Sequence, residues 1–186
     1  MTEKRKRLRN INRDIEVVVE SNIYASFSYS DKGVHLELSE IGDEEYLTFG
    51  QLKTLSTSKS KRILQNLNIL ITDVLDDEVE LEDVLEQLRL KKNYDTAKRI
   101  FDTDVVDNES FVRYLKNSNT TSADIRKVFD EHPFMKTILT ETAIEMYKKG
   151  SIDIGLVEAI LSHIGVKDVY SFLEDIRLSQ EPIKND

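Results

Sequence analysis

The sequence predicts an α+β fold, in which a small N-terminal antiparallel β-hairpin or meander with short helices precedes an α-helical bundle of about six helices. Two observations predict it. β-Branched and aromatic residues alternate in short runs over residues 15–38, as half-buried strands require. From residue 81 onward, apolar residues recur at i, i+3, i+4 and i+7, which lines one face of a helix. With 186 residues, 39% of them hydrophobic, the chain can bury a core.

The first 14 residues form a basic arm before an acidic body. Six of them are basic and only Glu3 and Asp14 are acidic, whereas the whole chain has a net charge of −9. A basic arm is typical either of a segment that contacts phosphate or an acidic neighbour, or of a solvated terminus. The basic residues of the arm are Lys4, Arg5, Lys6, Arg7, Arg9 and Arg13.

Three short runs after the arm predict β-strands, over residues 15–20, 23–29 and 34–38. The last two are joined across Ser30-Asp31-Lys32-Gly33, which favours a hairpin. Side chains alternate along a strand, so we expect Ala25, Phe27 and Tyr29 to share one face, and likewise Val34, Leu36 and Leu38. Two or three strands are marginal alone, so this sheet must pack on helices or on another chain.

A loop is expected over residues 40–46, followed by a short helix. Thr48 and Gln51 have the spacing of a capping box at its start. The run Ser56–Ser58 then begins a second helix with Ile63, Leu64 and Leu67 on its buried face. Residues 68–74 fit either a continued helix or a buried strand, because periodicity does not separate the two in so short a run.

Helical periodicity continues through residues 81–179, with short loops that favour antiparallel neighbours. Gly150 and Gly165 stand where helices end in a residue with positive φ. An acidic, weakly periodic stretch, residues 95–108, is predicted to be a linker or loop. It separates a mixed α+β region, residues 15–94, from a helical region, residues 109–180, and a tail follows at residues 181–186.

The sequence carries no signature of catalysis, of a cofactor or of a metal site. It has no cysteine, its three histidines lack metal-ligand spacing, and neither a nucleophile elbow nor a glycine-rich phosphate loop is present. The acidic run over residues 73–83 is interpreted as the start of a helix, since carboxylates there complement the helix dipole. Loop acids Asp43, Glu44 and Glu45 have no group near them in the sequence that specifies a substrate. We expect no membrane span and no export signal.

One stretch of the chain resembles a family of poorly characterised proteins in tailed bacteriophages. The likeness consists of Val18-Val19-Glu20-Ser21-Asn22, the hairpin, and Gly42-Asp43-Glu44-Glu45-Tyr46-Leu47 before a helix with Leu52, over about the first 80 residues. The resemblance implies a structural or assembly component of a virion, such as a capsid, neck or tail-associated protein. It places the protein in the virion or in the cytoplasm of the infected bacterial cell.

The residues favour the same class of function: a small sheet that needs a partner and a basic arm before an acidic body suit a non-enzymatic subunit of a larger assembly. Other protein subunits are then the partners, and Phe27, Tyr29, Leu36 and the arm are the predicted contact residues. The alternative is a small regulatory protein that contacts nucleic acid through residues 1–14, or a host protein through its acidic body. A third possibility is an enzyme whose site is built from residues far apart in sequence.

Overall fold

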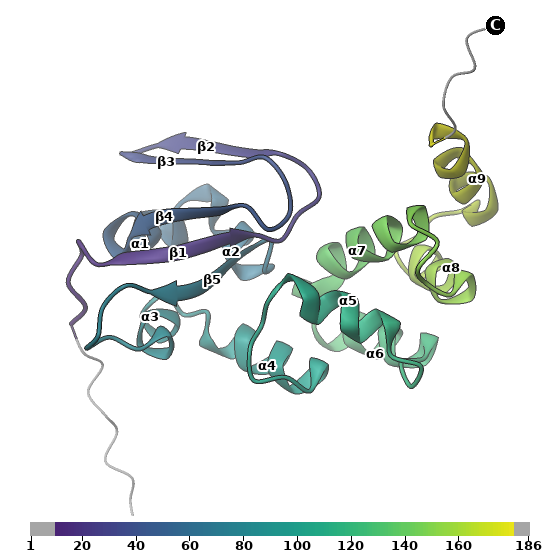
Figure 1. Ribbon diagram of the computed structural model, residues 1–186. Coiled ribbons are helices and arrows are strands. Elements are labelled where there is room, and N and C mark those ends of the chain that lie inside the picture. The colour runs from purple at the N-terminus through teal and green to yellow at the C-terminus, as the bar shows by residue number, and fades with distance from the viewer. Residues whose placement is uncertain (1–9, 181–186) are drawn as a thin grey trace, which may run out of the picture. The chain divides into compact units, whose positions relative to one another are not determined.

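The computed structural model describes residues 10–180, and the chain divides into two compact units (Figure 1). The first unit ends at Asn108 and the second begins at Glu109. Within the described residues, all strands belong to the first unit and the second unit is helical. The fold is therefore α+β, as the sequence predicts, with small antiparallel sheets before the helices.

A three-stranded antiparallel sheet lies at the centre of the first unit. Its strand order is β4-β1-β5, so β1 pairs with both neighbours. Val17 and Val19 of β1 are fully buried, which makes this strand the middle of the core. The register against β5 shifts between Val18 and Val19, as at a β-bulge. The strands are β1 (Glu16–Ser21), β4 (Glu44–Thr48) and β5 (Ile69–Val74).

A separate two-stranded sheet is the predicted hairpin, formed by β2 (Phe27–Asp31) and β3 (Val34–Leu38). The three-stranded meander is wrong, because β1 pairs with β4 and β5 and not with β2. The loop expected over residues 40–46 is also wrong at its end, where β4 begins at Glu44. The sequence of β4 lacks the alternating apolar pattern of a strand, because its first three residues are exposed and only Leu47 is buried. Residues 69–74 take the strand alternative.

The described part of the first unit also contains helical segments: α1 (Phe49–Thr57), the 3₁₀ turn η1 (Lys59–Lys61), α2 (Arg62–Gln65), α3 (Leu81–Gln87) and α4 (Lys91–Phe101). The capping box of α1 is confirmed. The Gln51 amide donates to Thr48 Oγ1 (3.2 Å), and the Thr48 amide donates to Gln51 Oε1 (2.8 Å). The predicted second helix is only four residues long, and Ser58 caps η1 in front of it.

Helix α4 occupies half of the stretch that the sequence predicts as a linker. It continues through Phe101 and ends at Asp102, whose φ of 52° is left-handed. Its buried residues include Tyr94 and Ala97, three positions apart, while Lys91 and Asp95 form an i,i+4 ion pair on the surface. Residues 95–101 are therefore helical, and the two units divide after Asn108.

The second unit contains α5 (Asn108–Lys116), α6 (Ser122–Glu131), η2 (Pro133–Met135), α7 (Lys136–Lys148), α8 (Ile154–His163) and α9 (Val169–Ser179). Over residues 81–179 the helices are thus somewhat more numerous than the six predicted. Val157, Leu161 and Leu173 form a buried cluster between α8 and α9. Gly150 and Gly165 have φ values of 61° and 93°, which confirms the predicted helix ends.

Candidate interaction surface

The β2–β3 hairpin has one apolar and one polar face. Its two-residue turn, Lys32-Gly33, has φ values of 50° and 77°, the positive pair of a type I′ turn. The register pairs Tyr29 with Leu36 and Phe27 with Leu38. The polar face consists of Ser28, Ser30, His35 and Glu37, which are all exposed.

The apolar face packs within the chain's own first unit. Leu36 and Leu38 are each only 1% exposed, and β3 lies beside both β4 and α1. The Gln51 side chain of α1 also donates to the Gly33 carbonyl at the hairpin turn (3.2 Å). Leu36 is therefore wrong as a predicted partner contact, because the partner that the sheet needs is another part of the same unit. Phe27 and Tyr29 are half-buried at the rim of this face.

The outer edge of β2 is the part of the hairpin that remains available. In the described residues β2 pairs only with β3. The residues that flank a two-residue turn form a hydrogen-bonded pair, and such pairs alternate along an antiparallel ladder. Asp31, Tyr29 and Phe27 therefore bond to β3, whereas the N–H and C=O groups of Ser28 and Ser30 point away from it.

The other strand edges of the first unit are covered or charged. At β5, the buried Tyr94 hydroxyl of α4 accepts a hydrogen bond from the Ile71 amide (2.6 Å). At β4, the strand lies next to β3 and exposes Glu44 and Glu45, carboxylates that oppose pairing with a further strand. Figure 1 shows β2 as the outer strand of the hairpin, with β3 between it and β4.

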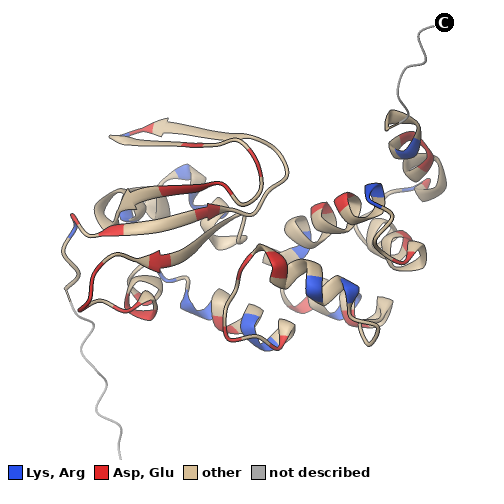
Figure 2. Cartoon of the chain, viewed as in Figure 1, with Lys and Arg blue, Asp and Glu red and all other residues tan. Residues whose placement is uncertain are grey.

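The predicted basic arm is only partly visible. Lys4, Arg5, Lys6, Arg7 and Arg9 lie outside the described residues. Arg13 is exposed, and its carbonyl accepts a hydrogen bond from the Gly50 amide at the start of α1 (2.8 Å). Beyond it, Figure 2 shows Asp and Glu spread over the strands and loops of the first unit. Arg13 is thus an exposed basic residue whose backbone is bonded to the start of α1.

Glu20 of β1 belongs to a half-buried polar cluster that sequence reasoning missed. Its carboxylate accepts a hydrogen bond from the Asn108 side chain, and it pairs across the ladder with Glu44. Burial, and then the charges of Glu44 and Asp107, raise the pKa of Glu20, while the Asn108 bond opposes them. Burial likewise raises the pKa of the Tyr94 hydroxyl, and the Glu20 charge adds to it. Only the position of Glu20 among strand valines hints at this cluster in the sequence.

The three acidic residues before Thr48 do not form a paired acid and base. The Asp43 carboxylate accepts hydrogen bonds from the Ser39 amide (2.7 Å) and the Glu40 amide (3.1 Å), which closes the turn before β4. Glu44 and Glu45 are adjacent on β4 and so point to opposite faces. In residues 10–180 no group of three histidines, aspartates or glutamates is placed to hold a metal ion.

An open pocket of about 690 Å³, lined by both polar and apolar residues, lies within the second unit, between the α5–α6 loop and the start of α8. Two of its polar residues accept hydrogen bonds from backbone amides at the starts of helices. Asp153 accepts a hydrogen bond from the Leu156 amide (3.0 Å) at the start of α8, and Thr121 accepts one from the Asp124 amide (3.3 Å) at the start of α6. The Thr121 hydroxyl also donates to the Asp124 carboxylate (2.5 Å), and both residues form the capping box of α6, so this pair too holds the start of a helix.

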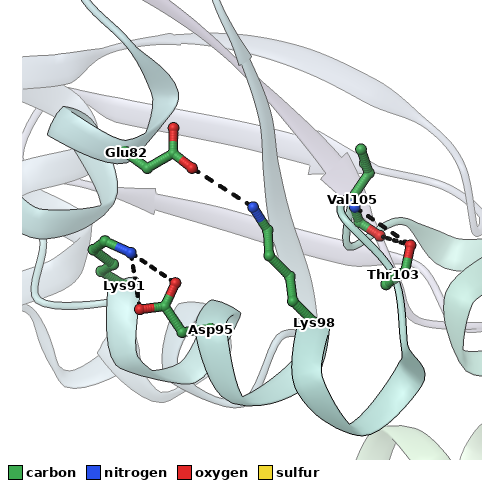
Figure 3. Close-up of polar contacts among 6 residues, drawn as sticks. All are labelled: Glu82, Lys91, Asp95, Lys98, Thr103 and Val105. Carbon is green, nitrogen blue, oxygen red and sulfur yellow. Dashed lines mark hydrogen bonds and ion pairs between the residues drawn. The ribbon is translucent and has the colours of Figure 1, made fainter.

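The charged residues on and near α4 make polar contacts with one another, which Figure 3 draws. Lys91 forms an ion pair with Asp95 one turn along the helix (2.7 Å), and Lys98 reaches Glu82 of α3 (3.6 Å). Thr103 closes the following turn, since its hydroxyl donates to the Val105 carbonyl (2.9 Å). These exposed pairs fix side-chain positions and contribute little to stability.

Comparison with family models, characterised proteins and solved structures found no match to this chain. A search of the described helices for one long and apolar enough to cross a membrane also found none.

Proposed function

We propose that this protein is a non-enzymatic structural or assembly component of a multi-subunit particle. The observation that supports the proposal most is the outer edge of β2, which pairs with no other strand in residues 10–180, whereas the edges of β4 and β5 are charged or bonded to a side chain. Backbone groups that point outward from a strand bind another strand readily, and proteins that do not use such an edge usually protect it. Other protein subunits are therefore the partners that this surface suits.

The resemblance to tailed-bacteriophage proteins extends this proposal to a particular setting. On that basis the assembly is a virion, and the chain is a capsid, neck or tail-associated subunit. The half-buried polar cluster at Glu20 and the open pocket of the second unit add no nucleophile, base or cofactor site that would favour an enzyme. The alternative is a regulatory protein that binds nucleic acid through residues 1–14. Such binding weakens as the salt concentration rises, whereas an apolar contact between subunits does not.

The proposal is tested by measuring the mass of the full chain in solution by light scattering, at about 50 mM and about 500 mM salt, alone and with duplex DNA or single-stranded RNA. A variant that lacks residues 1–14 is measured in parallel. Oligomers that persist at high salt and without the arm support an assembly subunit. A monomer that binds nucleic acid only at low salt, and only with the arm present, contradicts the proposal, because counterion release makes phosphate contacts salt-sensitive.

A further inference from the structure

Within residues 10–180, strand β2 has none of the features that usually prevent an edge from pairing. Edge strands are commonly protected by lysine, proline, a bulge or a covering element. The two residues whose backbone groups point outward, Ser28 and Ser30, have small, exposed, uncharged side chains. The only charge in the strand is Asp31, at its end next to the turn. Four backbone groups are therefore available for pairing, as far as the described part of the chain is concerned.

The sequence of β2 is complementary to itself in one antiparallel register. When two copies pair with Tyr29 opposite Tyr29, Ser28 of each lies opposite Ser30 of the other. That register bonds all four outward groups of each copy to the partner strand. If the register shifts by two residues, either Ser28 lies opposite Ser28 of the second copy or Ser30 lies opposite Ser30. The other serine is then opposite a residue outside β2. The register with Tyr29 opposite Tyr29 is thus the one in which all outward backbone groups of β2 form hydrogen bonds.

The side chains favour the same register. It places Asp31 opposite Phe27 of the second copy, so the two acidic side chains do not face each other. Tyr29 meets its counterpart in a non-hydrogen-bonded pair, the closer kind of pair, in which aromatic side chains interact favourably. Phe27 and Tyr29 are half-buried at this rim, and a neighbouring strand covers part of what remains exposed.

We infer that β2 pairs with β2 of a second copy of this chain, so that two hairpins join into a four-stranded sheet about a twofold axis. The inference rests on the proposed function and names one of the contacts that the assembly uses. A contact of two five-residue strands is smaller than a standard interface, so the dimer forms only at raised concentration. Each copy has a net charge of −9, so salt strengthens the dimer by screening repulsion.

The absence of cysteine from the chain makes a direct test possible. Ser28→Cys and Ser30→Cys are prepared as separate full-length proteins and oxidised alone and as an equal mixture. Directly opposite residues in a hydrogen-bonded pair have Cα atoms about 5.5 Å apart, within disulfide reach. In the same register the two copies of either position alone lie diagonally, with Cα atoms more than about 7 Å apart. The mixture is therefore expected to give at least about tenfold more linked dimer than either protein alone.

Two controls make the result specific. A mixture of Ser28→Cys with Ser118→Cys, an exposed residue of the second unit, measures random collision. Ser30→Pro removes an outward amide but no bond to β3, so the hairpin is retained while the self-association seen by sedimentation is lost. Equal linking in all mixtures, or a wild-type chain that stays monomeric at all concentrations, overturns the inference. Oligomers that persist in Ser30→Pro also overturn it, yet they leave the proposed assembly function intact.

Discussion

Strands β5 and β2 of the first unit each have one edge that is not paired within their own sheet. The two edges differ in the side chains that contact them. At β5 the Tyr94 hydroxyl accepts the Ile71 hydrogen bond in a fully enclosed position. At β2 the nearby tyrosine, Tyr29, also has an enclosed hydroxyl, but it has no hydrogen-bond partner in the described residues. Tyr94 of α4 thus bonds to an amide on the outer side of β5, whereas Tyr29 belongs to β2 itself and bonds to nothing on its outer side. In the described residues β2 pairs only with β3, so its outer edge has no comparable contact from another strand.

The largest expected effect comes from removing the hydroxyl that closes β5. Tyr94→Phe leaves the buried Ile71 amide without an acceptor, so we expect the free energy of unfolding to fall by about 1–3 kcal/mol. Tyr29→Phe is the matched control. It removes a buried hydroxyl that has no hydrogen-bond partner in the described residues, so stability is expected to stay the same or to rise. Urea unfolding of both variants measures this, and equal losses would refute the contrast between the two edges.

The next effect concerns the turn that sets which groups of β2 point outward. Gly33 has a φ of 77°, and an added Cβ there meets no atom within 4 Å. Gly33→Ala therefore adds only backbone strain, about 1–2 kcal/mol. Gly150→Ala, at a φ of 61° with equally open surroundings, places the same strain in the second unit. Amide hydrogen exchange should quicken across β2 and β3 in the first variant and remain unchanged there in the second.

The link between the hairpin and α1 is expected to matter less. Gln51→Glu keeps the acceptor that completes the capping box but removes the donor to the Gly33 carbonyl. We expect a loss of about 0.5–1.5 kcal/mol, the usual value of one hydrogen bond, with faster exchange in the hairpin. Gln51→Ala removes both contacts and should also loosen the first turn of α1. If Gln51→Glu exchanges like wild type in the hairpin while Gln51→Ala loosens α1, the side chain acts only as a cap.

The sequence predicts those features of this comparison that depend on neighbouring residues. The hairpin, the capping box at Thr48 and the helix ends at Gly150 and Gly165 are all local patterns, and the structure confirms them. The predicted strand over residues 23–29 is wrong at its start, because β2 begins at Phe27 and Ala25 is exposed before it. Strand β4 was missed because its buried side depends on β1, about thirty residues earlier. The choice of Leu36 as a partner contact fails for a similar reason. Periodicity shows that a face is apolar, but it does not show what covers that face.

The candidate interaction surface could not be predicted from sequence patterns, because it depends on the turn type and on contacts between distant residues. Whether the backbone groups of Ser28 point toward β3 or away from it follows from the turn type, which the φ values of Lys32 and Gly33 define. That Tyr94 closes β5 depends on a contact between residues 23 positions apart. Glu20 gave no sequence signal beyond one acidic residue among valines, because its neighbours Glu44 and Asn108 come from distant segments.

The smallest expected effect concerns Glu20, on the strand between the two edges of the three-stranded sheet. Its pKa is raised in the folded state, chiefly by burial and then by Glu44 and Asp107. The folded state therefore holds the proton more tightly than the unfolded state, and this contribution to stability is present at low pH and lost as the pH rises through the raised pKa. Glu20→Gln mimics the protonated form, so we expect it to be more stable than wild type at neutral pH and equal to it in acid.

Glu141 of α7 provides the matched comparison, because its pKa is raised by burial alone. Glu141→Gln should show the same dependence on pH, measured as the thermal midpoint between mildly acid and neutral buffer. The two variants should differ in their response to salt. Repulsion from Glu44 and Asp107 is screened by added ions, so the benefit of Glu20→Gln should shrink as salt is raised, whereas that of Glu141→Gln should not. A salt-independent gain at both positions would show that the acidic neighbours of Glu20 contribute nothing measurable.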